Sequence, residues 1–504
     1  LVRAGIALKR YGTTSAGSFE VAAARYPDRT AIIDELGALT YREIKRRANA
    51  LASALAADGI GPGDSVAVMC RNHRGFVEAT IAIALLGANV IYLNTAFAAP
   101  QLTEVVEREQ AAAIIYDEEF ANVVAPARAG RKTYVAWQDG ESATDDARVE
   151  DLIAMGDPAG VPAPERPGRV VILTSGTTGA PKGARRSAPS LSVAAALLSK
   201  MPLKAGEPTV IAAPMFHTWG LAHFTLGVPL GSTMILRRRF DPEETLRVVA
   251  RYRATGLAVV PVMLQRILEL PDEVIDRYDT SSLRVIAASG SALPGPLATR
   301  VMDRFGDVLY NTYGSTEVAW ATIATPEDMR AAPGTAGRPP FGTRVKLFDE
   351  HGREVPVGQS GRIFVGNEFP FEGYTNGGGK EIIDGLMSSG DVGHFDAAGR
   401  LFVDGRDDDM IISGGENVFP SEVEDLLAGH EAVREVAVIG VEDAEWGQRL
   451  KAFVALKDGA TCDEGALKAY VRENLASFKV PREVVFVDEL PRNATGKVLK
   501  RELR

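Results

Sequence analysis

The sequence is poor in cysteine, because only Cys70 and Cys462 occur among its 504 residues. They lie far apart, form no CxxC pair and belong to no Cys/His cluster with the spacing typical of a metal site. A disulfide-stapled secreted fold and a structural zinc domain are therefore disfavoured. Two widely separated thiols are compatible with a reducing compartment.

The sequence also lacks a long hydrophobic run. Its most apolar stretch, residues 76–93, is interrupted by Glu78, Thr80, Gly87 and Asn89 and falls short of a membrane span. We expect a helix, a turn and a strand there. No apolar segment with a cleavage site opens the chain, and the chain ends in ELR rather than the peroxisomal SKL. The expected location is therefore the cytoplasm, with no transmembrane segment.

Basic residues are too few for a nucleic-acid-binding protein. Lys and Arg number 56 against 66 Asp and Glu, which gives a formal net charge of −10. A nucleic-acid binder normally carries a basic domain or stripe, so no such partner is expected. Apolar residues make up 46% and charged residues 24%, which is ordinary globular usage. A chain of 504 residues exceeds the size of a single hydrophobic core, and two or more domains are expected.

Short apolar runs rich in Val, Ile and Leu alternate with helical patterns along the first part of the chain. Such alternation predicts parallel sheets covered by helices, and hence an α/β fold class. Thr40 followed by Glu43 forms a capping-box pattern that predicts a helix over residues 41–58. The predicted strands lie at residues 65–70, 112–117, 209–213, 233–238, 257–261 and 283–289.

The sequence pattern changes after residue 335, where short strand-like segments alternate with turns rich in Gly and Pro. This pattern predicts a small β-rich subdomain at about residues 335–405, which completes a large N-terminal domain over residues 1–407. Residues 408–504 then predict a small α+β domain with helices at 420–428 and 464–474 and three strands. No internal repeat or low-complexity tract occurs.

The segment VVILTSGTTGAPKG, residues 170–183, carries the strongest chemical signal. A buried-strand pattern runs into a loop in which glycines let the backbone approach an anion, hydroxyls donate hydrogen bonds and a lysine supplies charge. The loop is not a Walker A motif, because Pro181 stands where that motif needs Gly before its Lys. It predicts a phosphate-binding loop made of Thr174, Ser175, Gly176, Thr177, Thr178, Gly179 and Lys182.

TSGTTGAPKG resembles the signature loop of the adenylate-forming superfamily, which includes acyl-CoA synthetases, peptide-synthetase adenylation domains and luciferases. The other motifs of that superfamily follow in the same order across nearly the whole chain. The chain is most similar to the fatty-acid–CoA ligases within it. The resemblance implies that a carboxylic acid reacts with ATP to an acyl-adenylate, that coenzyme A then takes the acyl group, and that Mg²⁺ is the cofactor.

The segment NTYGSTE, residues 311–317, resembles the superfamily's adenine and α-phosphate site. The resemblance implies that Tyr313 stacks on adenine beside Gly314, and that Asn311 hydrogen-bonds the amino edge of the base. It further implies that Thr316 contacts the α-phosphate. Glu317 would hold Mg²⁺, since a hard cation prefers carboxylate oxygen.

Two later segments resemble the ribose site and the joint between the domains. In SGDVGHFD the resemblance assigns Asp391 to the ribose hydroxyls, with Ser389 where the superfamily more often has Thr. In GRDDDMIISGGENVFPSE it assigns Arg406 to the ribose and Asp408 to the hinge of a mobile C-terminal domain. The backbone of Gly414 and Gly415 would line the coenzyme A tunnel.

The segment PRNATGKVLKREL resembles the superfamily's last motif and makes Lys497 the adenylation lysine. An ammonium group there can bridge the attacking carboxylate and the α-phosphate, which offsets the repulsion between two anions.

The acid pocket is assigned by resemblance to PMFHTWGLAHF and ASGSALP. His217 would lie beside the carboxylate of the acid, and Trp219 either gates an alkyl tunnel or packs as an ordinary core residue. Gly290, Ser291 and Ala292 are small residues of the pocket floor, with Gly290 also near adenine. No Arg or Lys lies in either segment, which disfavours a dicarboxylic acid.

An apolar acid is expected, and a medium- to long-chain fatty acid is preferred over an aryl acid such as benzoate. A carrier-protein-loading adenylation enzyme and a luciferase-like oxygenase share these motifs. A catalytically dead scaffold is disfavoured, because Lys497, Glu317 and the Gly-rich loop are all present. The sequence leaves peripheral membrane contact and homodimer formation open.

Overall fold

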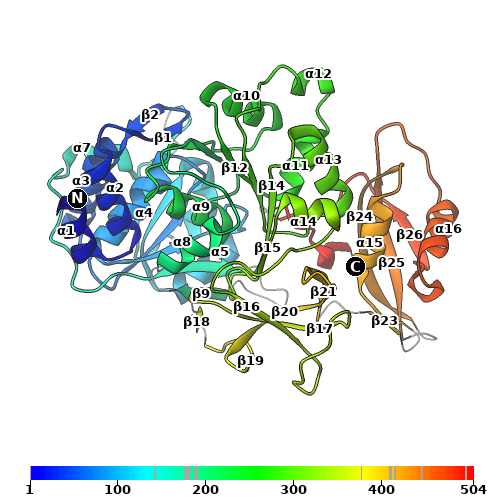
Figure 1. Cartoon of the computed structure of the whole chain (residues 1–504). Coiled ribbons are helices and arrows are strands. Elements are labelled where there is room, and N and C mark those ends of the chain that lie inside the picture. Colours follow the sequence, from blue (N-terminus) through cyan, green and yellow to red (C-terminus); the bar gives the residue numbers. More distant parts are fainter. Residues whose placement is uncertain are drawn as a thin grey trace. The chain divides into compact units, whose positions relative to one another are not determined.

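The computed structural model describes residues 2–140, 144–174, 182–186, 191–369, 371–375, 377–407, 411–413, 416–443, 447–493 and 496–503. The chain divides into two compact units (Figure 1). Unit 1 consists of Leu1–Val259, Arg266–Ala287 and Asn367–Gly379, and unit 2 consists of Val260–Gln265, Ala288–Gly366 and Lys380–Arg504. Across the described residues, no helix combines the length and the apolar character needed to cross a membrane.

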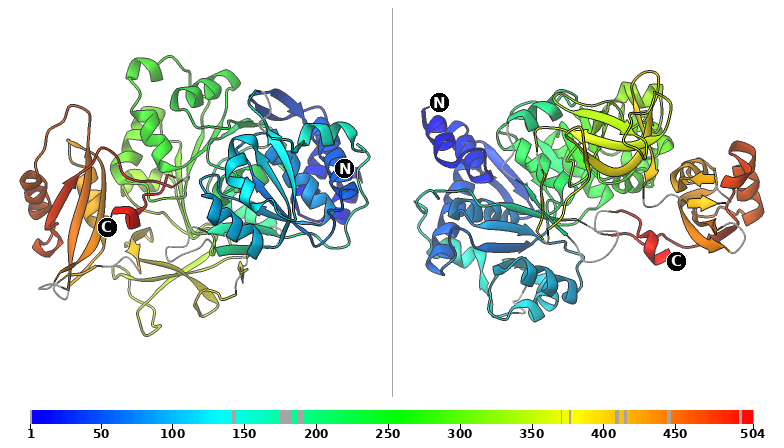
Figure 2. Two further views of the ribbon diagram at one scale, coloured as in Figure 1. Left: turned by 180° about the vertical axis from the view of Figure 1, so that it is seen from behind. Right: turned by 90° about the horizontal axis from the view of Figure 1, so that it is seen from below.

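Unit 1 contains a sheet whose central strands are parallel, as the apolar runs predicted. Alternate strand residues point to opposite faces, so Ile91 and Leu93 join the core under α5 (Ala99–Arg108), whereas Tyr92 stacks on Phe76 of α4 (Arg74–Leu86). Figure 2 shows the blue helices beside this sheet. The strands, in spatial order, are β18 (Phe371–Tyr374), β9 (Lys182–Arg186), β8 (Val170–Thr174), β4 (Asn89–Tyr92), β3 (Ser65–Met69), β5 (Ala111–Asp117), β6 (Lys132–Trp137) and β7 (Ala147–Arg148).

The helices of unit 1 begin and end where local chemistry predicts. Helix α3 (Tyr41–Ala57) has the predicted capping box, in which Thr40 accepts from the Glu43 amide and Glu43 accepts from the Thr40 amide. Helix α4 ends at Gly87, whose φ of 69° requires a residue that adopts the left-handed region easily. Residues 76–93 therefore form the predicted helix, turn and strand. The other N-terminal helices are α1 (Val2–Tyr11), α2 (Ser15–Arg25) and α7 (Val149–Met155).

A second sheet of unit 1 carries the acid-side segment, residues 214–224, which the resemblance assigns to the acid pocket. Strand β10 pairs in parallel with both β11 and β12, so the carboxyl ends of these strands lie at one edge. Helix α9 (Thr218–Gly227) follows β10, and α10 (Pro242–Tyr252) follows β11. Those of its strands that belong to unit 1 run in the order β13 (Val285–Ala288), β12 (Gly256–Val259), β10 (Thr209–Ile211), β11 (Met234–Leu236), β1 (Thr30–Asp34) and β2 (Gly37–Thr40).

Unit 2 contains the predicted β-rich region. Strand β14 (Leu309–Tyr313) pairs with β15 (Thr322–Ala324) in antiparallel register. A five-stranded sheet follows, in which neighbouring strands pair in antiparallel register. Its strands are β16 (Arg344–Phe348), β17 (Gly361–Gly366), β19 (Ile382–Ile383), β20 (Leu386–Phe395) and β21 (Leu401–Arg406).

The C-terminal part of unit 2 has its own core. Helices α15 (Pro420–Ala428) and α16 (Glu464–Asn474), both with the predicted bounds, place Leu427 and Leu467 against the sheet. The opposite face of β24 and β25 packs against Leu490 and Leu503, so apolar residues cover both faces. The strands are β22 (Ile411–Ser413), β23 (Glu416–Val418), β24 (Val433–Asp443), β25 (Gly447–Leu456) and β26 (Glu483–Phe486).

Candidate active site

An unsatisfied amide oxygen marks the nucleotide side of the site in unit 2. Asn311 lies on β14 and is buried, with 8% of its surface exposed. Among the described residues, none donates a hydrogen bond to its Oδ1. A buried acceptor without a donor is costly, so the position suits a ligand N–H such as the amino group of adenine.

Tyr313 and Asp391 meet beside Asn311, although 78 residues separate them in sequence. The Tyr313 hydroxyl donates to Asp391 Oδ2 at 2.5 Å. Asp391 on β20 pairs with Arg406 on β21, and its amide donates to Ser389 Oγ at 3.1 Å. Burial raises the pKa of Asp391 above its ordinary value, while the Tyr313 hydrogen bond and the charges of Arg406, Lys497 and Lys380 act in the opposite direction. Aromatic and carboxylate groups assigned to adenine and ribose thus lie together.

The turn after β14 holds Glu317 in a defined position. Ser315 Oγ accepts from the amides of Glu317 and Val318, each at 3.3 Å, and donates to Glu317 Oε2 at 2.9 Å. A Cβ on Gly314 would lie 2.1 Å from the Ala319 carbonyl oxygen, so only glycine fits there. Ala319 has a φ of 61°, which is strained for a residue other than glycine. Thr316 lies in the same turn.

The chemistry of this turn fits a Mg²⁺ site. Glu317 offers a carboxylate oxygen, which is the ligand type that Mg²⁺ prefers, and Ser315 orients it. Mg²⁺ usually takes one or two carboxylates and completes its shell with phosphate and water. A single carboxylate is therefore sufficient when a nucleotide supplies the other oxygens.

The charge of Lys497 acts on Asp391. The Lys497 amide donates to Asn493 Oδ1 at 2.9 Å, and Arg492 pairs with Val498, so it sits in a tight turn. The Lys497 side chain is exposed, and its charge is one of those that lower the pKa of Asp391. The adenylation lysine assigned by resemblance thus acts on the carboxylate assigned to ribose.

The segment after β13, residues 289–292, is hydrogen-bonded to β14, the strand that carries Asn311 and Tyr313. Ser289 Oγ donates to the Thr312 carbonyl oxygen at 2.7 Å, which holds residues 289–292 beside β14. Gly290 has a φ of 95°, and a Cβ there would lie 3.3 Å from Val260. Ser291 is half-buried and Ala292 is exposed.

The predicted phosphate-binding loop connects two antiparallel strands. Thr174 at the end of β8 pairs with Lys182 at the start of β9. The Thr375 amide donates to the Gly183 carbonyl oxygen at 2.8 Å. A strand on each side of residues 175–181 differs from a Walker A motif, in which a helix follows the glycine-rich residues. The assigned residues Ser175, Gly176, Thr177, Thr178, Gly179, Asp408, Gly414 and Gly415 lie outside the described residues.

His217 and Trp219 stand at the start of α9 in unit 1. His217 is the N-cap residue of this helix, and its buried Nε2 has no hydrogen-bond partner among the described residues. Burial lowers the pKa of His217 to about 4, so the ring is neutral at pH 7. A neutral imidazole can donate a hydrogen bond to a carboxylate oxygen. The geometry is compatible with the role that the resemblance implies.

Trp219 is anchored rather than free to swing. Its Nε1 donates to the Val259 carbonyl oxygen at 3.1 Å and to the Ala287 carbonyl oxygen at 3.3 Å. These carbonyls lie at the carboxyl ends of β12 and β13, the edge at which open α/β sheets bind ligands. Trp219 is half-buried, so part of its ring remains accessible.

The sequence reasoning missed Asn72, which holds the acid-side segment in place. Its Nδ2 donates to the carbonyl oxygens of Ile211 and Ala213 at 3.1 and 2.9 Å, and its Oδ1 accepts from the Met215 amide at 2.8 Å. Asn72 is 4% exposed. A polar residue just beyond the buried run 65–69 was the available signal, but its partners lie about 140 residues away in sequence.

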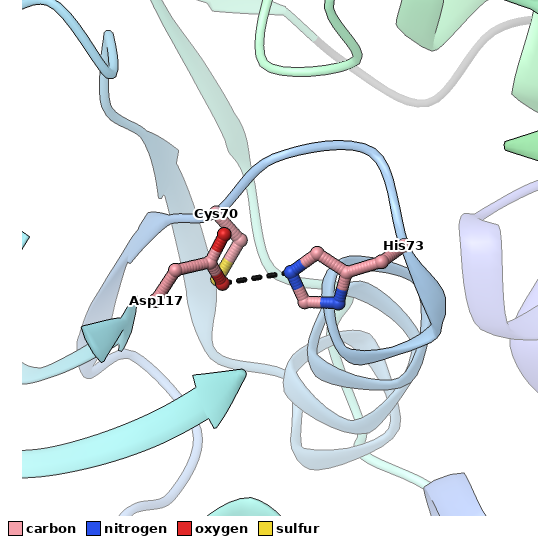
Figure 3. Close-up of side chains that lie close together, drawn as sticks. All are labelled: Cys70, His73 and Asp117. Atoms are coloured by element: carbon pink, nitrogen blue, oxygen red, sulfur yellow. Dashed lines mark hydrogen bonds and ion pairs between the residues drawn. The ribbon is translucent and has the colours of Figure 1, made fainter. Parts of the chain in front are cut away.

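Three side chains of the kinds that bind metals lie together in unit 1, although the sequence spacing of the cysteines predicted no Cys/His cluster. Cys70, His73 and Asp117 are fully buried, and their ligand atoms lie within 4.8 Å of one another (Figure 3). Sequence spacing could not reveal this approach, because Asp117 comes from another strand.

Hydrogen bonds already engage every member of this cluster. His73 Nδ1 accepts from the Gly75 amide at 3.0 Å, so the ring proton is on Nε2 and points to Asp117 Oδ1 at 2.7 Å. Asp117 Oδ2 accepts from the Arg71 amide, and the Cys70 thiol donates to the Ile115 carbonyl oxygen. A metal on Nε2 would require a proton on Nδ1, where the Gly75 amide points. The cluster therefore caps α4 and fixes the loop that carries Asn72.

Comparisons with known proteins agree with this fold. Residues 19–375 match the family model described as AMP-binding enzyme, and residues 422–497 match that of the AMP-binding enzyme C-terminal domain. A feruloyl-CoA synthase from an Amycolatopsis species is 37% identical over 498 residues, which cover 97% of this chain and 98% of that protein. A 2-succinylbenzoate–CoA ligase from Geobacillus kaustophilus is 35% identical over 495 residues, covering 95% of each chain.

A solved structure extends the likeness to three dimensions. The crystal structure of the anthranilate CoA ligase AuaEII with anthranoyl-AMP has a TM-score of 0.89 at 26% identity, covering 97% of this chain and 96% of that chain. The chain therefore belongs to the AMP-binding enzyme family. It is an enzyme of the AMP-forming acid–CoA ligase class, and the resemblance to the adenylate-forming superfamily and the α/β fold class inferred from sequence are confirmed.

Proposed function

We propose that the protein activates an aromatic carboxylic acid with ATP and transfers the acyl group to coenzyme A. The observation that carries the nucleotide part is the presence, within unit 2, of three features: Asn311 Oδ1, which has no donor among the described residues, the Tyr313–Asp391 pair and the charge of Lys497. These groups supply an acceptor for the base, a carboxylate for ribose hydroxyls and a cation for phosphate. That set is complementary to an adenosine nucleotide.

In the first half-reaction, a carboxylate oxygen of the acid attacks the α-phosphorus of ATP. The bond from that phosphorus to the bridging oxygen breaks, and pyrophosphate leaves. Lys497 and Thr316 reduce the repulsion between the two anions, while Asn311, Tyr313 and Asp391 orient the nucleoside. Glu317 would hold Mg²⁺, which neutralises phosphate charge when bound. His217 donates a hydrogen bond to the carboxylate.

In the second half-reaction, the thiol sulfur of coenzyme A attacks the carbonyl carbon of the adenylate. The bond from that carbon to the phosphate oxygen breaks, AMP leaves and the thiol proton passes to solvent. The hinge at Asp408 and the tunnel at Gly414 and Gly415 remain proposals from the sequence. The domain bounds of 1–407 and 408–504 are likewise proposals from the sequence.

The position of Trp219 supports an aromatic acid over a fatty acid. A gate for an alkyl tunnel must leave its place, but this indole is held by two strand-end carbonyls. A fixed half-buried indole instead forms a flat wall against which an aromatic ring can pack. The names of three relatives contain feruloyl, 2-succinylbenzoate and anthranilate, and each of these groups has a benzene ring. A fatty acid, favoured by the small residues 290–292, becomes the second candidate.

A substrate panel tests the proposal. Pyrophosphate and AMP release are measured with ATP, Mg²⁺ and coenzyme A on cinnamate, benzoate, octanoate and palmitate. We expect the highest kcat/KM on an aromatic acid and no ADP. If kcat/KM instead rises steadily with alkyl chain length, as about 0.8 kcal/mol per buried methylene would produce, the acid is aliphatic. Formation of ADP would contradict the adenylate itself.

A further inference from the structure

Thr375 connects the strand that follows the predicted phosphate-binding loop to a distant helix of unit 1. Its amide donates to the Gly183 carbonyl oxygen at 2.8 Å, and its hydroxyl donates to Glu109 Oε1 at 2.6 Å. Glu109 and Thr375 lie 266 residues apart in sequence. The sequence analysis gave neither residue a role, because only the fold brings them together.

The contact between Thr375 and Gly183 is close as well as polar. Gly183 is buried on β9 and directly follows Lys182, the last residue of the predicted loop. A Cβ at Gly183 would lie 2.7 Å from Thr375 Oγ1 and 2.9 Å from Thr375 Cγ2, which is closer than side chains approach one another. The neighbouring pair, Tyr374 and Ala184, belongs to the antiparallel ladder between β18 and β9. Thr375 therefore fixes β9 at the residue where the predicted loop ends.

Glu109 has a well-defined position from which to hold Thr375. It is the C-cap residue of α5, and its side chain is 5% exposed. Arg108 Nε donates to the same Oε1 at 2.9 Å, so a positive charge accompanies the buried carboxylate. Leu102 and Val105 of α5 are fully buried in the core of unit 1. Segments with many buried apolar contacts open rarely, so α5 provides a rigid support.

The hydrogen bond between these residues is of a strong kind. A hydroxyl that donates to an ionised carboxylate forms a shorter and stronger bond than two neutral groups do, and 2.6 Å is a typical length for it. Binding groups must be held close to their productive positions by supporting contacts. Because Gly183 is joined to Lys182, loss of this support should weaken whatever the predicted loop binds.

We propose that Glu109 and Thr375 are positioning residues for the phosphates of ATP, acting through Gly183 and the predicted phosphate-binding loop. This inference rests on the proposed function and adds two residues that lie outside every motif. ATP has three phosphates, AMP has one and adenosine has none. The contribution of the pair to affinity should therefore increase from adenosine to AMP to ATP, whereas a pair that only stabilises the fold would affect the three ligands alike.

The test compares the dissociation constants of adenosine, AMP and MgATP in the absence of acid and coenzyme A, by calorimetry. Thr375→Val keeps the shape of the side chain but removes the hydroxyl. It should weaken binding of ATP about 3- to 10-fold, weaken binding of AMP less and leave binding of adenosine unchanged. Thr375→Ser keeps the hydroxyl, and Glu109→Gln keeps an acceptor, so both should bind ATP more tightly than Thr375→Val does.

Thr103→Val is the matched control. The Thr103 hydroxyl also belongs to a half-buried threonine of unit 1, and it donates to the Ala99 carbonyl oxygen within α5 at 2.9 Å. This variant should leave the ratio of the ATP and adenosine affinities at the wild-type value, whatever its melting temperature.

Two results would overturn the positioning role: an unchanged affinity for ATP in Thr375→Val, or an equal loss for all three ligands. A failure of the proposed function looks different. In that case the wild type itself releases neither AMP nor pyrophosphate with any acid of the substrate panel, and the inference falls with it.

Discussion

Truncating Asn72 should loosen the segment that carries His217 and thereby weaken binding of the acid. Asn72→Ala removes three hydrogen bonds to the backbone of Ile211, Ala213 and Met215. The Met215 amide has one proton and loses its acceptor, which costs about 1–3 kcal/mol in a buried site. The two bonds to carbonyl oxygens contribute about 1 kcal/mol each. We therefore expect a loss of at least about 3 kcal/mol in unfolding free energy.

Part of this loss should appear in substrate binding. If about half of the lost free energy favours a displaced segment, the KM for the acid should rise about tenfold, since a factor of ten corresponds to about 1.4 kcal/mol. The KM for ATP should stay near the wild-type value, because the residues assigned to adenine and ribose lie in unit 2. The assay is pyrophosphate release at varied acid and at varied ATP, beside a thermal melt.

Asn49→Ala provides the control. Asn49 is also a buried amide of unit 1, with 8% exposure, and its Nδ2 donates to the Pro158 carbonyl oxygen at 3.2 Å. This variant should be less stable than wild type with an unchanged KM for the acid. If both variants raise the KM for the acid equally, Asn72 acts through general stability alone and the reasoning is refuted.

Three further predictions concern single groups of the site. Lys497→Ala should slow adenylate formation about 10²- to 10³-fold, by analogy with loss of an oxyanion donor. The same variant should convert presynthesised acyl-adenylate and coenzyme A at a near-normal rate. Equal losses of rate in both steps, measured by single turnover, would contradict the assignment of Lys497. Asn311→Leu should raise the KM for ATP much more than the KM for the acid, and the same KM for ATP as wild type would argue against the adenine role. Burial lowers the pKa of His223 to about 4 in the folded protein, against an ordinary value of 6.5. As the pH falls below 6.5 the unfolded chain therefore binds a proton first, and about 3 kcal/mol of stability should be lost by pH 4. His223→Phe should flatten that part of a urea-unfolding pH profile, and an unchanged slope would show that the histidine is not neutral in the fold.

The elements whose signals are local were predictable from sequence. The capping box at Thr40 predicted α3 to within one residue, and the bounds of α15 and α16 are those predicted. Apolar runs predicted the parallel strands, because a strand buried on both faces must be apolar throughout. Their ends were less certain, since residues such as Arg237 and Arg238 after β11 pair with acids instead of continuing the strand.

The contacts that define the acid side were not predictable in the same way. Whether Trp219 gates or anchors depends on carbonyls 40 and 68 residues away, which no local pattern encodes. Asn72 gains its importance from long-range approach, and it would read as an ordinary polar residue in isolation. The motif resemblance assigned Asn311, Tyr313 and Asp391 to one nucleotide, and their structure places them together in unit 2.

The burial of Cys70 makes the chain a convenient protein for spectroscopy. Desolvation raises the pKa of the Cys70 thiol well above its ordinary value, and its side chain is closed to solvent. The other thiol, Cys462, is half-buried and precedes α16. Burial and the charge of Asp463 also raise the pKa of the Cys462 thiol, but its side chain is accessible to solvent and that of Cys70 is not. A maleimide fluorophore should therefore attach at Cys462 without any engineered cysteine. Such a probe would report, on the native sequence, how the C-terminal helices respond when nucleotide, acid and thiol are added in turn.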